Sequence, residues 1–176
     1  MNKLVLALEK DARHVENLKI NKMTLSHLEK ISENLARDFD DFWNYSTLKG
    51  ELLNENSHYI VLEREEEILG FGGIWRNIDE AHITNIVIRK DLRKQGYATI
   101  ILQNLILITN DLHLPTITLE VNKKNIAAIK LYKKFNFQIV GERKKYYITD
   151  SALIMTRTQE REIYKRERNN TNEKYL

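Results

Sequence analysis

Apolar residues in the first part of the chain follow the period of a strand and then that of a helix. Between residues 18 and 23, apolar and polar positions alternate imperfectly, which predicts an edge strand. Between residues 25 and 36 the apolar positions recur at helical spacing, and Thr24 or Ser26 can supply the N-cap. We therefore expect an edge strand followed by an amphipathic helix over residues 25–36.

Aromatic side chains are concentrated between residues 39 and 45, just before a predicted short helix at residues 47–53. They are Phe39, Phe42, Trp43 and Tyr45. Such a cluster usually packs in a hydrophobic core. The alternative is that its outer members, Phe42 and Trp43, line a substrate groove.

Three apolar runs then follow, each of strand length and separated from the next by a polar turn. They span residues 58–63, 68–75 and 81–88 and predict an antiparallel meander. The second run contains Gly70, Gly72 and Gly73, which allow a bulge or a close approach of backbone. No helix follows these glycines directly, so they do not form a dinucleotide-binding motif.

The second half of the chain alternates helices with strands. Helical periodicity predicts helices over residues 95–109 and 126–135, and Asn125 is the expected N-cap of the second. Three further strands are expected at residues 116–121, 137–142 and 147–156. The order of elements predicts a mixed α/β (α+β) fold, in which helices cover both faces of one sheet.

The length of 176 residues suits a single domain with a full hydrophobic core. We assign this domain to residues 17–158, preceded by an N-terminal extension at residues 1–16. Residues 159–176 carry mixed charge and are expected to form a tail outside the domain.

Composition excludes several classes of protein. The chain has no cysteine, which removes disulfides, thiolate metal sites and a cysteine nucleophile. Its five histidines are scattered without a metal-binding spacing, so no metal is expected. No apolar run approaches the about 20 residues of a membrane-spanning helix. A net charge of +3 is too small to indicate nucleic-acid binding. We expect a cytoplasmic protein, monomeric or weakly dimeric.

The segment between the predicted strand 81–88 and the predicted helix 95–109 suggests anion binding. A loop that contains Gly96 and ends at a helix start presents free backbone N–H groups, with the positive end of the helix dipole behind them. Arg93 and Lys94 add positive charge. A plain helix start is the simpler interpretation of this segment taken alone, but a second group of motifs follows between residues 120 and 137.

Together these motifs resemble the GNAT superfamily of acyl-CoA-dependent N-acetyltransferases over about residues 18–157. The motifs are Arg93-x-x-Gly96-x-Ala98, then Leu119-Glu120-Val121-Asn122, Asn125, Ala127-Ala128 and Leu131-Tyr132. Within the superfamily the chain is most similar to the RimI type, the ribosomal-protein-alanine N-acetyltransferases, a likeness that Arg143-x-x-Tyr146-Tyr147 and Ala152-x-x-Met155 support. The resemblance implies the GNAT fold, a mostly antiparallel sheet of about six to seven strands between helices.

The resemblance implies that acetyl-CoA is the acetyl donor and assigns residues to bind it. Amides of the loop and helix start would hold its pyrophosphate, and a strand that splays from its neighbour would hold its pantetheine arm. The residues implied for the donor are Ile86, Val87, Ile88, Arg93, Lys94, Gln95, Gly96, Tyr97, Ala98, Thr99 and Asn125.

Glu120 and Tyr132 are the candidate catalytic residues. An α-amino group has a pKa near ~8, so a base must take a proton as the nitrogen attacks. Glu120 interrupts an apolar strand and is the expected base, although it could also be a solvent-facing strand residue. The RimI pattern puts the acid for the leaving thiolate at Tyr132, which could instead be a core tyrosine. Without cysteine, direct attack in a ternary complex is expected, with backbone N–H groups near Val87 stabilising the oxyanion.

Tyr146 and Tyr147 are implied to border the groove for the acceptor peptide, although an ordinary aromatic strand is an equal alternative. Ser151 departs from the RimI pattern, which often has an acid there, and this weakens the acceptor assignment. The expected function is acetylation of a protein N-terminus, the terminal alanine of a small-subunit ribosomal protein. The alternatives are a small amine or lysine acceptor, or a non-catalytic coenzyme-A-binding module.

Overall fold

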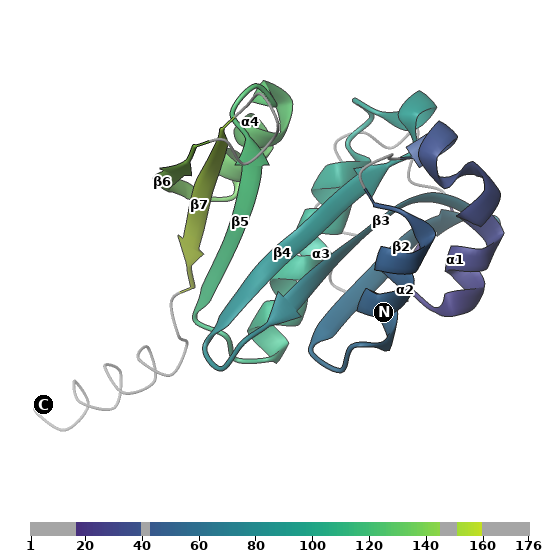
Figure 1. Ribbon diagram of the computed structural model, residues 1–176, viewed down its shortest axis with the longest axis horizontal. Coiled ribbons are helices and arrows are strands. Elements are labelled where there is room, and N and C mark those ends of the chain that lie inside the picture. The colour runs from purple at the N-terminus through teal and green to yellow at the C-terminus, as the bar shows by residue number, and fades with distance from the viewer. Residues whose placement is uncertain (1–16, 40–42, 145–150, 160–176) are drawn as a thin grey trace, which may run out of the picture.

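The computed structural model describes residues 17–39, 43–144 and 151–159. Its centre is a seven-stranded sheet in the order β1-β2-β3-β4-β5-β7-β6 (Figure 1). The strands are β1 (Leu18–Lys22), β2 (Ser57–Arg64), β3 (Glu67–Arg76), β4 (Glu80–Ile88), β5 (Thr116–Asn122), β6 (Gln138–Arg143) and β7 (Ala152–Thr158). The GNAT-like mixed sheet predicted from the sequence is confirmed.

The strands β2, β3 and β4 form the predicted antiparallel meander, and β1 pairs with β2 at the edge of the sheet, as predicted. The strand β4 then runs parallel to β5, and this is the one parallel pairing among the described strands. The strand β7 lies between β5 and β6 and pairs with both in antiparallel fashion. The sheet is therefore mostly antiparallel, as expected.

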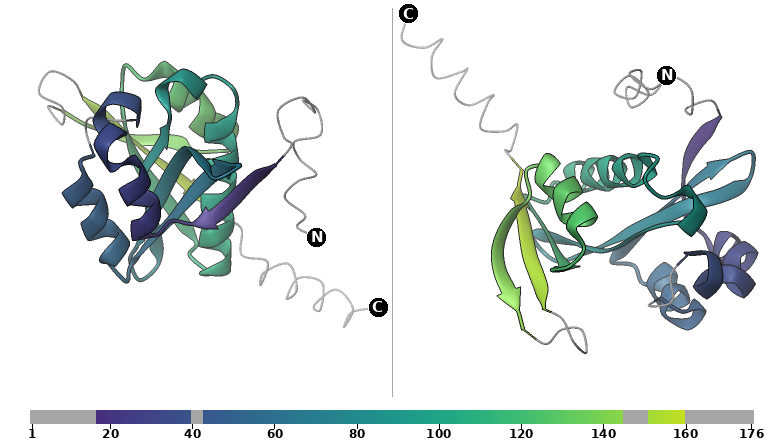
Figure 2. Two further views of the ribbon diagram at one scale, coloured as in Figure 1. Left: turned by 90° about the vertical axis from the view of Figure 1, so that its right-hand side faces the viewer. Right: turned by 90° about the horizontal axis from the view of Figure 1, so that it is seen from above.

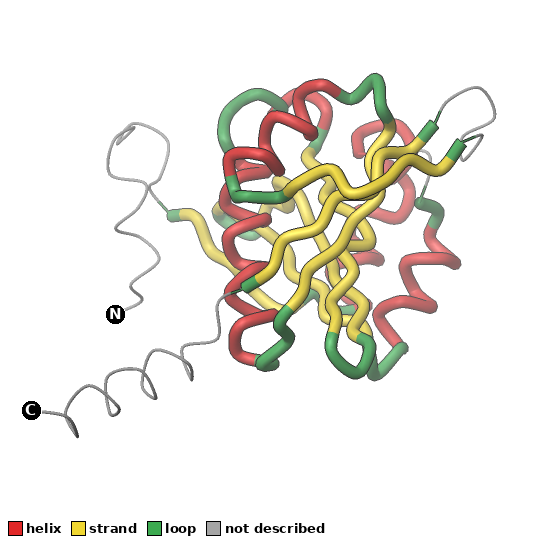
Figure 3. Tube along the Cα trace, turned by 90° about the vertical axis from the view of Figure 1, so that its left-hand side faces the viewer, coloured by secondary structure: helices red, strands yellow, loops and turns green. Residues whose placement is uncertain are grey.

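Helices cover both faces of the sheet, as the right-hand view of Figure 2 shows. One face carries α1 (Leu25–Ile31) and α2 (Tyr45–Leu53), and their apolar residues share a core cluster with Tyr59, Phe71 and Val87 of the sheet. The opposite face carries α3 (Tyr97–Asp111) and α4 (Ile126–Lys134) over a larger cluster. Figure 3 shows strands between the two groups of helices.

The helix predicted over residues 25–36 differs from the observed structure. The α-helix ends at Ile31 and continues as a 3₁₀ turn, η3 (Ser32–Asn34), and a π-helical turn, η4 (Leu35–Phe39). Two features accompany the change. The Ser32 hydroxyl donates to the carbonyl of Glu29, and Lys90 holds the carbonyls of Ala36 and Arg37 at 2.8 and 2.9 Å. A contact from a distant part of the chain thus fixes the end of this helical segment.

The C-terminal elements agree with expectation except at one boundary. Asn125 caps α4, with its side chain accepting a hydrogen bond from the Ala128 N–H at 3.1 Å. Asn136 has a positive φ of 64°, a conformation that asparagine tolerates and that the turn after α4 uses. The last predicted strand, residues 147–156, is observed as β7 from Ala152 to Thr158, and residues 145–150 lie outside the described part.

Candidate active site

The strands β4 and β5 pair over only part of their length. The paired residues run from Glu80 with Thr116 to Ile83 with Leu119, and past that point the two strands diverge (Figure 1). We call this divergence the fork. Residues 85–88 of β4 continue beyond the fork and pair with β3 on one side, and β5 makes no pairs with them on the other side. Main-chain groups at such an edge are available to an extended ligand.

The loop after β4 leads into α3 through two residues with left-handed backbone. It contains a 3₁₀ turn, η5 (Lys90–Leu92), and then Lys94 with φ 65° and Gly96 with φ 88°. Gly96 is the N-cap of α3, and an added Cβ there would meet no atom of the protein within 4 Å. The requirement for glycine is therefore its backbone angle, and the space beside it is open to a ligand.

The first N–H groups of a helix have no partner within the helix. At the start of α3, the N–H groups of Thr99 and Ile100 already donate to the Gly96 carbonyl at 2.9 and 3.4 Å. The amides predicted to bind phosphate run from Lys94 to Thr99. The amides of residues 94–98 precede this hydrogen-bonded turn, whereas the Thr99 amide already donates within it. The helix dipole adds partial positive charge at this end.

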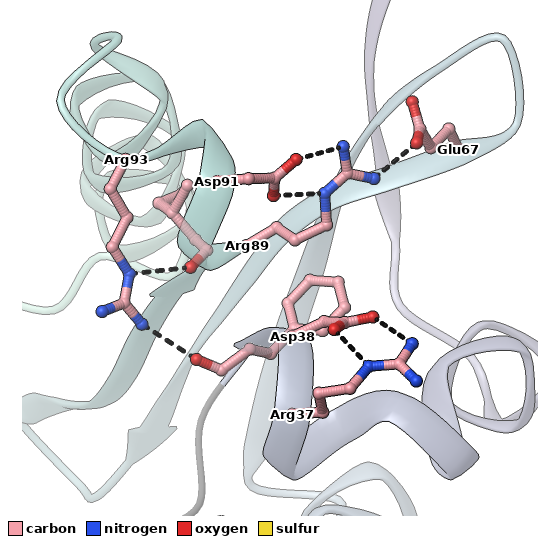
Figure 4. A network of polar contacts seen from close by, with 8 residues as sticks. Arg37, Asp38, Glu67, Arg89, Asp91 and Arg93 are labelled. Carbon is pink, nitrogen blue, oxygen red and sulfur yellow. Dashed lines mark hydrogen bonds and ion pairs between the residues drawn. The ribbon is translucent and has the colours of Figure 1, made fainter.

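Arg93 points away from the α3 start in this structure (Figure 4). Its Nε donates to the Ile88 carbonyl at 3.2 Å, and its Nη2 donates to the Phe39 carbonyl at 2.9 Å. The guanidinium thus ties the end of β4 to the end of η4. Direct contact of Arg93 with phosphate stays a prediction, while its positioning of the loop is observed.

A second arginine, Arg89, makes further contacts at the loop that follows β4 (Figure 4). It makes a two-point contact with Asp91, at 2.7 and 3.0 Å, and also contacts Glu67 at the start of β3. These hydrogen bonds raise the pKa of Arg89 above its ordinary value, and the guanidinium lowers the pKa of Asp91. The loop that precedes α3 is therefore braced against two neighbouring elements.

Glu120 is the first residue of β5 beyond the last pair with β4. Its neighbours Leu119 and Val121 belong to the core under α3 and α4, so strand alternation directs Glu120 to the face of α1 and α2. Its side chain is only 13% exposed, and its Oε1 accepts from Arg143 Nη2 at 2.8 Å. A mostly buried carboxylate at the fork differs from the plain solvent-facing residue considered as the alternative.

His82 lies on the same face as Glu120 and was not expected from the sequence, where the histidines looked scattered. Its Nδ1 is 3.2 Å from Thr118 Oγ1, and that hydroxyl donates to Glu80 Oε1 at 3.0 Å. Burial lowers the pKa of His82, and the negative charges of Glu120 and Glu80 oppose that shift. A row of partly buried polar residues thus leads along the paired part of the strands toward the fork.

The sequence indicates Arg143 only as part of a motif and does not predict its contact with Glu120. The two residues belong to strands that both pair with β7, and sequence distance gives no sign of this arrangement. Asn85 was also missed, although it interrupts an apolar run as Glu120 does. A polar residue inside a buried strand was the available signal.

Tyr132 lies on α4 and is buried, with 9% of its surface exposed. Its ring packs against Phe137 at 5.7 Å between centroids, within the core under α3 and α4. Glu120 and Tyr132 therefore approach the sheet from opposite faces. Tyr146 and Tyr147, predicted to border an acceptor groove, lie outside the described residues, as does Phe42.

Two classes of feature are not found in the part of the chain that the structure describes. No group of three or more His, Cys, Asp or Glu side chains there could hold a metal ion. No helix among those residues has the length and apolar character needed to cross a membrane.

Comparison with known proteins agrees with the resemblance found in the sequence. The model of the acetyltransferase (GNAT) family matches residues 20–137. A Bacillus subtilis (strain 168) protein, provisionally named a ribosomal protein bS18-alanine N-acetyltransferase, is 34% identical over 139 residues, which cover 77% of this chain and 92% of the relative.

Two solved structures extend the comparison. The crystal structure of the ribosomal-protein-S18-alanine N-acetyltransferase from Escherichia coli superposes with a TM-score of 0.73 at 26% identity, covering 80% of this chain and 93% of that one. A GNAT family acetyltransferase from Elizabethkingia anophelis, crystallised with acetyl-CoA bound, shares the fold with a TM-score of 0.66 at 16% identity, covering 82% and 99%.

Proposed function

Because this chain belongs to the GNAT family of acetyltransferases, we propose that it transfers an acetyl group from acetyl-CoA to a protein amino terminus. The proposed acceptor is the N-terminal alanine of the small-subunit ribosomal protein bS18, the protein that appears in the names of the relatives. Such an acceptor would place the reaction in the cytoplasm. The chain is an acyltransferase, and the identity of its acceptor is what we propose.

The chain offers a fitting place for acetyl-CoA, which supplies the acetyl group as an activated thioester. The open space beside Gly96 and the start of α3 suit the pyrophosphate. The outer edge of β4 at Ile86, Val87 and Ile88 suits the amide-containing pantetheine arm, because β5 has diverged there. Asn125 is the further residue proposed to contact the donor, in addition to capping α4.

Glu120 is the proposed general base. The acceptor amine is mostly protonated at neutral pH, since its pKa is near ~8, and it must lose a proton to react. The Glu120 carboxylate lies at the fork on the face of α1 and α2, where it can receive this proton directly or through water. Arg143 Nη2 contacts the Oε1 of this carboxylate at 2.8 Å, and we propose the carboxylate as the proton acceptor.

Tyr132 is the proposed general acid, which gives its phenolic proton to the sulfur of the departing coenzyme A. Its position on α4, under the opposite face of the sheet, suits a donor that enters the fork from the side of α3 and α4. The amine would then enter from the side of α1 and α2. Base and acid would thus act on opposite sides of the same carbonyl carbon.

The observation that carries this proposal is the position of Glu120, a nearly buried carboxylate one residue past the last β4–β5 pair. Its test is a panel of acceptors with acetyl-CoA, followed by intact-mass spectrometry. One peptide begins with the bS18 alanine sequence, a second has the same sequence with a blocked terminus and an internal lysine, and the third acceptor is a polyamine.

We expect an added acetyl group on the first peptide alone. Acetylation of the blocked peptide or of the polyamine, with the alanine peptide unchanged, would replace the acceptor and keep the chemistry. Binding of coenzyme A without turnover of any acceptor would instead indicate a non-catalytic module.

A further inference from the structure

Asn85, on β4 just past the fork, has a side chain that makes no hydrogen bond within the described part of the chain. The residue is 9% exposed, and both its Nδ2 and its Oδ1 are buried and unpaired. Buried polar groups are nearly always hydrogen-bonded, because leaving one unpaired costs the desolvation of that group. Among the described residues, His58 and Tyr97 each have one such atom, and Asn85 has an unpaired donor and acceptor together.

A β-bulge determines the direction of this side chain. On β3, Gly73 pairs with Asn85 while the next residue, Ile74, pairs with Ile83, so Thr84 is an extra residue on β4. Without the bulge, Asn85 would point to the same face as Ile83, which lies in the core under α3 and α4. Bulges commonly redirect a side chain beside an active site.

With the bulge, Asn85 points to the face of α1 and α2. Two residues further along, Val87 packs in the core cluster of that face, which fixes the alternation. The cross-strand partner Gly73 agrees, since a Cβ there would lie 2.4 Å from the Tyr59 ring, which belongs to the same cluster. Glu120 also points to this face, so the two side chains flank the fork from its two strands.

We propose that Asn85 binds the first peptide unit of the acceptor and thereby selects peptide amino termini, an inference that rests on the proposed function. A carboxamide offers one acceptor and two donors, the complement of a main-chain N–H and C=O. The Asn85 Oδ1 would accept from the peptide N–H, and its Nδ2 would donate to the peptide carbonyl. Because no described residue bonds to either atom, the side chain can turn toward a ligand without breaking a hydrogen bond there.

This contact explains how one site would distinguish acceptors that share an amine. An alanine amino terminus carries a peptide unit next to the reacting nitrogen, whereas a polyamine and the end of a lysine side chain do not. An acceptor without that unit leaves Asn85 unpaired, and sites with unpaired buried polar groups discriminate strongly against such ligands. Asn85 is thus assigned to acceptor specificity and Glu120 to proton transfer.

The test is a cycle of two changes, one in the enzyme and one in the peptide. Asn85→Ala is compared with wild type, and the alanine peptide is compared with the same peptide methylated at its first peptide nitrogen, which removes the N–H. The measured quantities are kcat and KM for peptide at saturating acetyl-CoA. Asn104→Ala is the matched control, because Asn104 lies on α3, over the opposite face of the sheet, and bonds to the Ile100 carbonyl of its own helix.

We expect Asn85→Ala to lower kcat/KM for the unmodified peptide by about tenfold, mainly through KM, with the KM for acetyl-CoA unchanged. Methylation should impair wild type by a similar factor and have a smaller effect on Asn85→Ala, since the contact is already lost. The near-isosteric Asn85→Leu should show the same peptide defect with a higher Tm, because it removes an unpaired buried amide. Asn104→Ala should match wild type toward both peptides.

The inference would be overturned if both Asn85 variants had a kcat/KM for peptide within about twofold of wild type and a raised Tm. The unpaired amide would then only destabilise the fold and have no role in binding the acceptor. Equal effects of methylation in wild type and Asn85→Ala would also overturn the inference. Failure of the wild-type enzyme to acetylate the peptide would contradict the proposed function, and this inference with it. The activity of the wild-type enzyme therefore separates failure of the proposed function from failure of the inference alone.

Discussion

The glycine at position 70 provides a test of how β3 supports the fork. Gly70 on β3 pairs with Ile88, and an ideal Cβ built on it would lie 2.6 Å from the Val87 carbonyl oxygen and 2.7 Å from Ile88 Cδ1. An ordinary contact begins at 3.4 Å, so the backbone oxygen would have to move by about 0.8 Å (3.4 − 2.6). A flexible side chain can turn away, but a strand carbonyl moves only with its strand.

Gly70→Ala should therefore lower the free energy of unfolding by roughly 1–3 kcal/mol, the usual cost of overpacking a well-packed site. For a chain of this size each kcal/mol corresponds to about 2–4 °C in Tm. The displaced residues, Val87 and Ile88, are also those proposed to hold the pantetheine arm. We therefore expect weaker binding of acetyl-CoA in the same variant.

The matched control is Gly50→Ala in α2, where an added Cβ would meet nothing within 4 Å. Replacing an exposed glycine inside a helix by alanine should raise the free energy of unfolding by about 0.5–1 kcal/mol. Urea denaturation measures both stabilities, and calorimetric titration with acetyl-CoA measures both affinities. If Gly70→Ala were as stable as Gly50→Ala and bound acetyl-CoA equally well, the proposed support of the fork by β3 would be wrong.

Three further predictions concern the proposed chemistry and the titration of the fork. Glu120→Gln and Tyr132→Phe should each lower kcat by about tenfold or more while acetyl-CoA binding persists, and near-normal rates in both would refute their roles. Burial lowers the pKa of His82 below its ordinary 6.5, so the unfolded chain takes up a proton before the folded protein does. The free energy of unfolding should fall as pH drops below about 6.5, and His82→Gln should flatten that slope in urea titrations; His58, whose pKa is lowered in the same way, also contributes to the slope. Asn125→Ala should cost about 0.5–2 kcal/mol of stability through loss of the α4 cap, measured by the same titrations, and an unchanged stability would contradict its capping role.

Most of the fold could be predicted because its signals are local. The meander follows from alternation within each strand, and the Asn125 cap depends on residues three positions apart. The end of the first helix could not be predicted in this way. Lys90, 54 positions from Ala36, binds that carbonyl, and no local pattern reports such a contact.

The candidate site likewise contains residues with a local sequence signal and residues whose position depends on distant contacts. Glu120 could be named as a candidate because a carboxylate interrupts an apolar strand, and Gly96 because a glycine precedes a helix. The direction of Asn85 was not predictable, because it depends on a bulge that exists only once β3 and β4 pair. The contact of Arg143 with Glu120 likewise requires the insertion of β7 between their strands.

The proposed binding of the donor's diphosphate by main-chain amides can be tested directly by measuring the affinities of two ligands by calorimetry. Acetyl-CoA carries the nucleotide diphosphate, and S-acetylpantetheine carries the same thioester without it. Loss of two hydrogen bonds to a charged group should cost at least about 3 kcal/mol, or roughly a hundredfold in Kd. We expect that acetyl-CoA binds at one site per chain and that S-acetylpantetheine binds at least that much more weakly. Equal affinity for the two ligands, or no heat with acetyl-CoA at millimolar concentration, would contradict it.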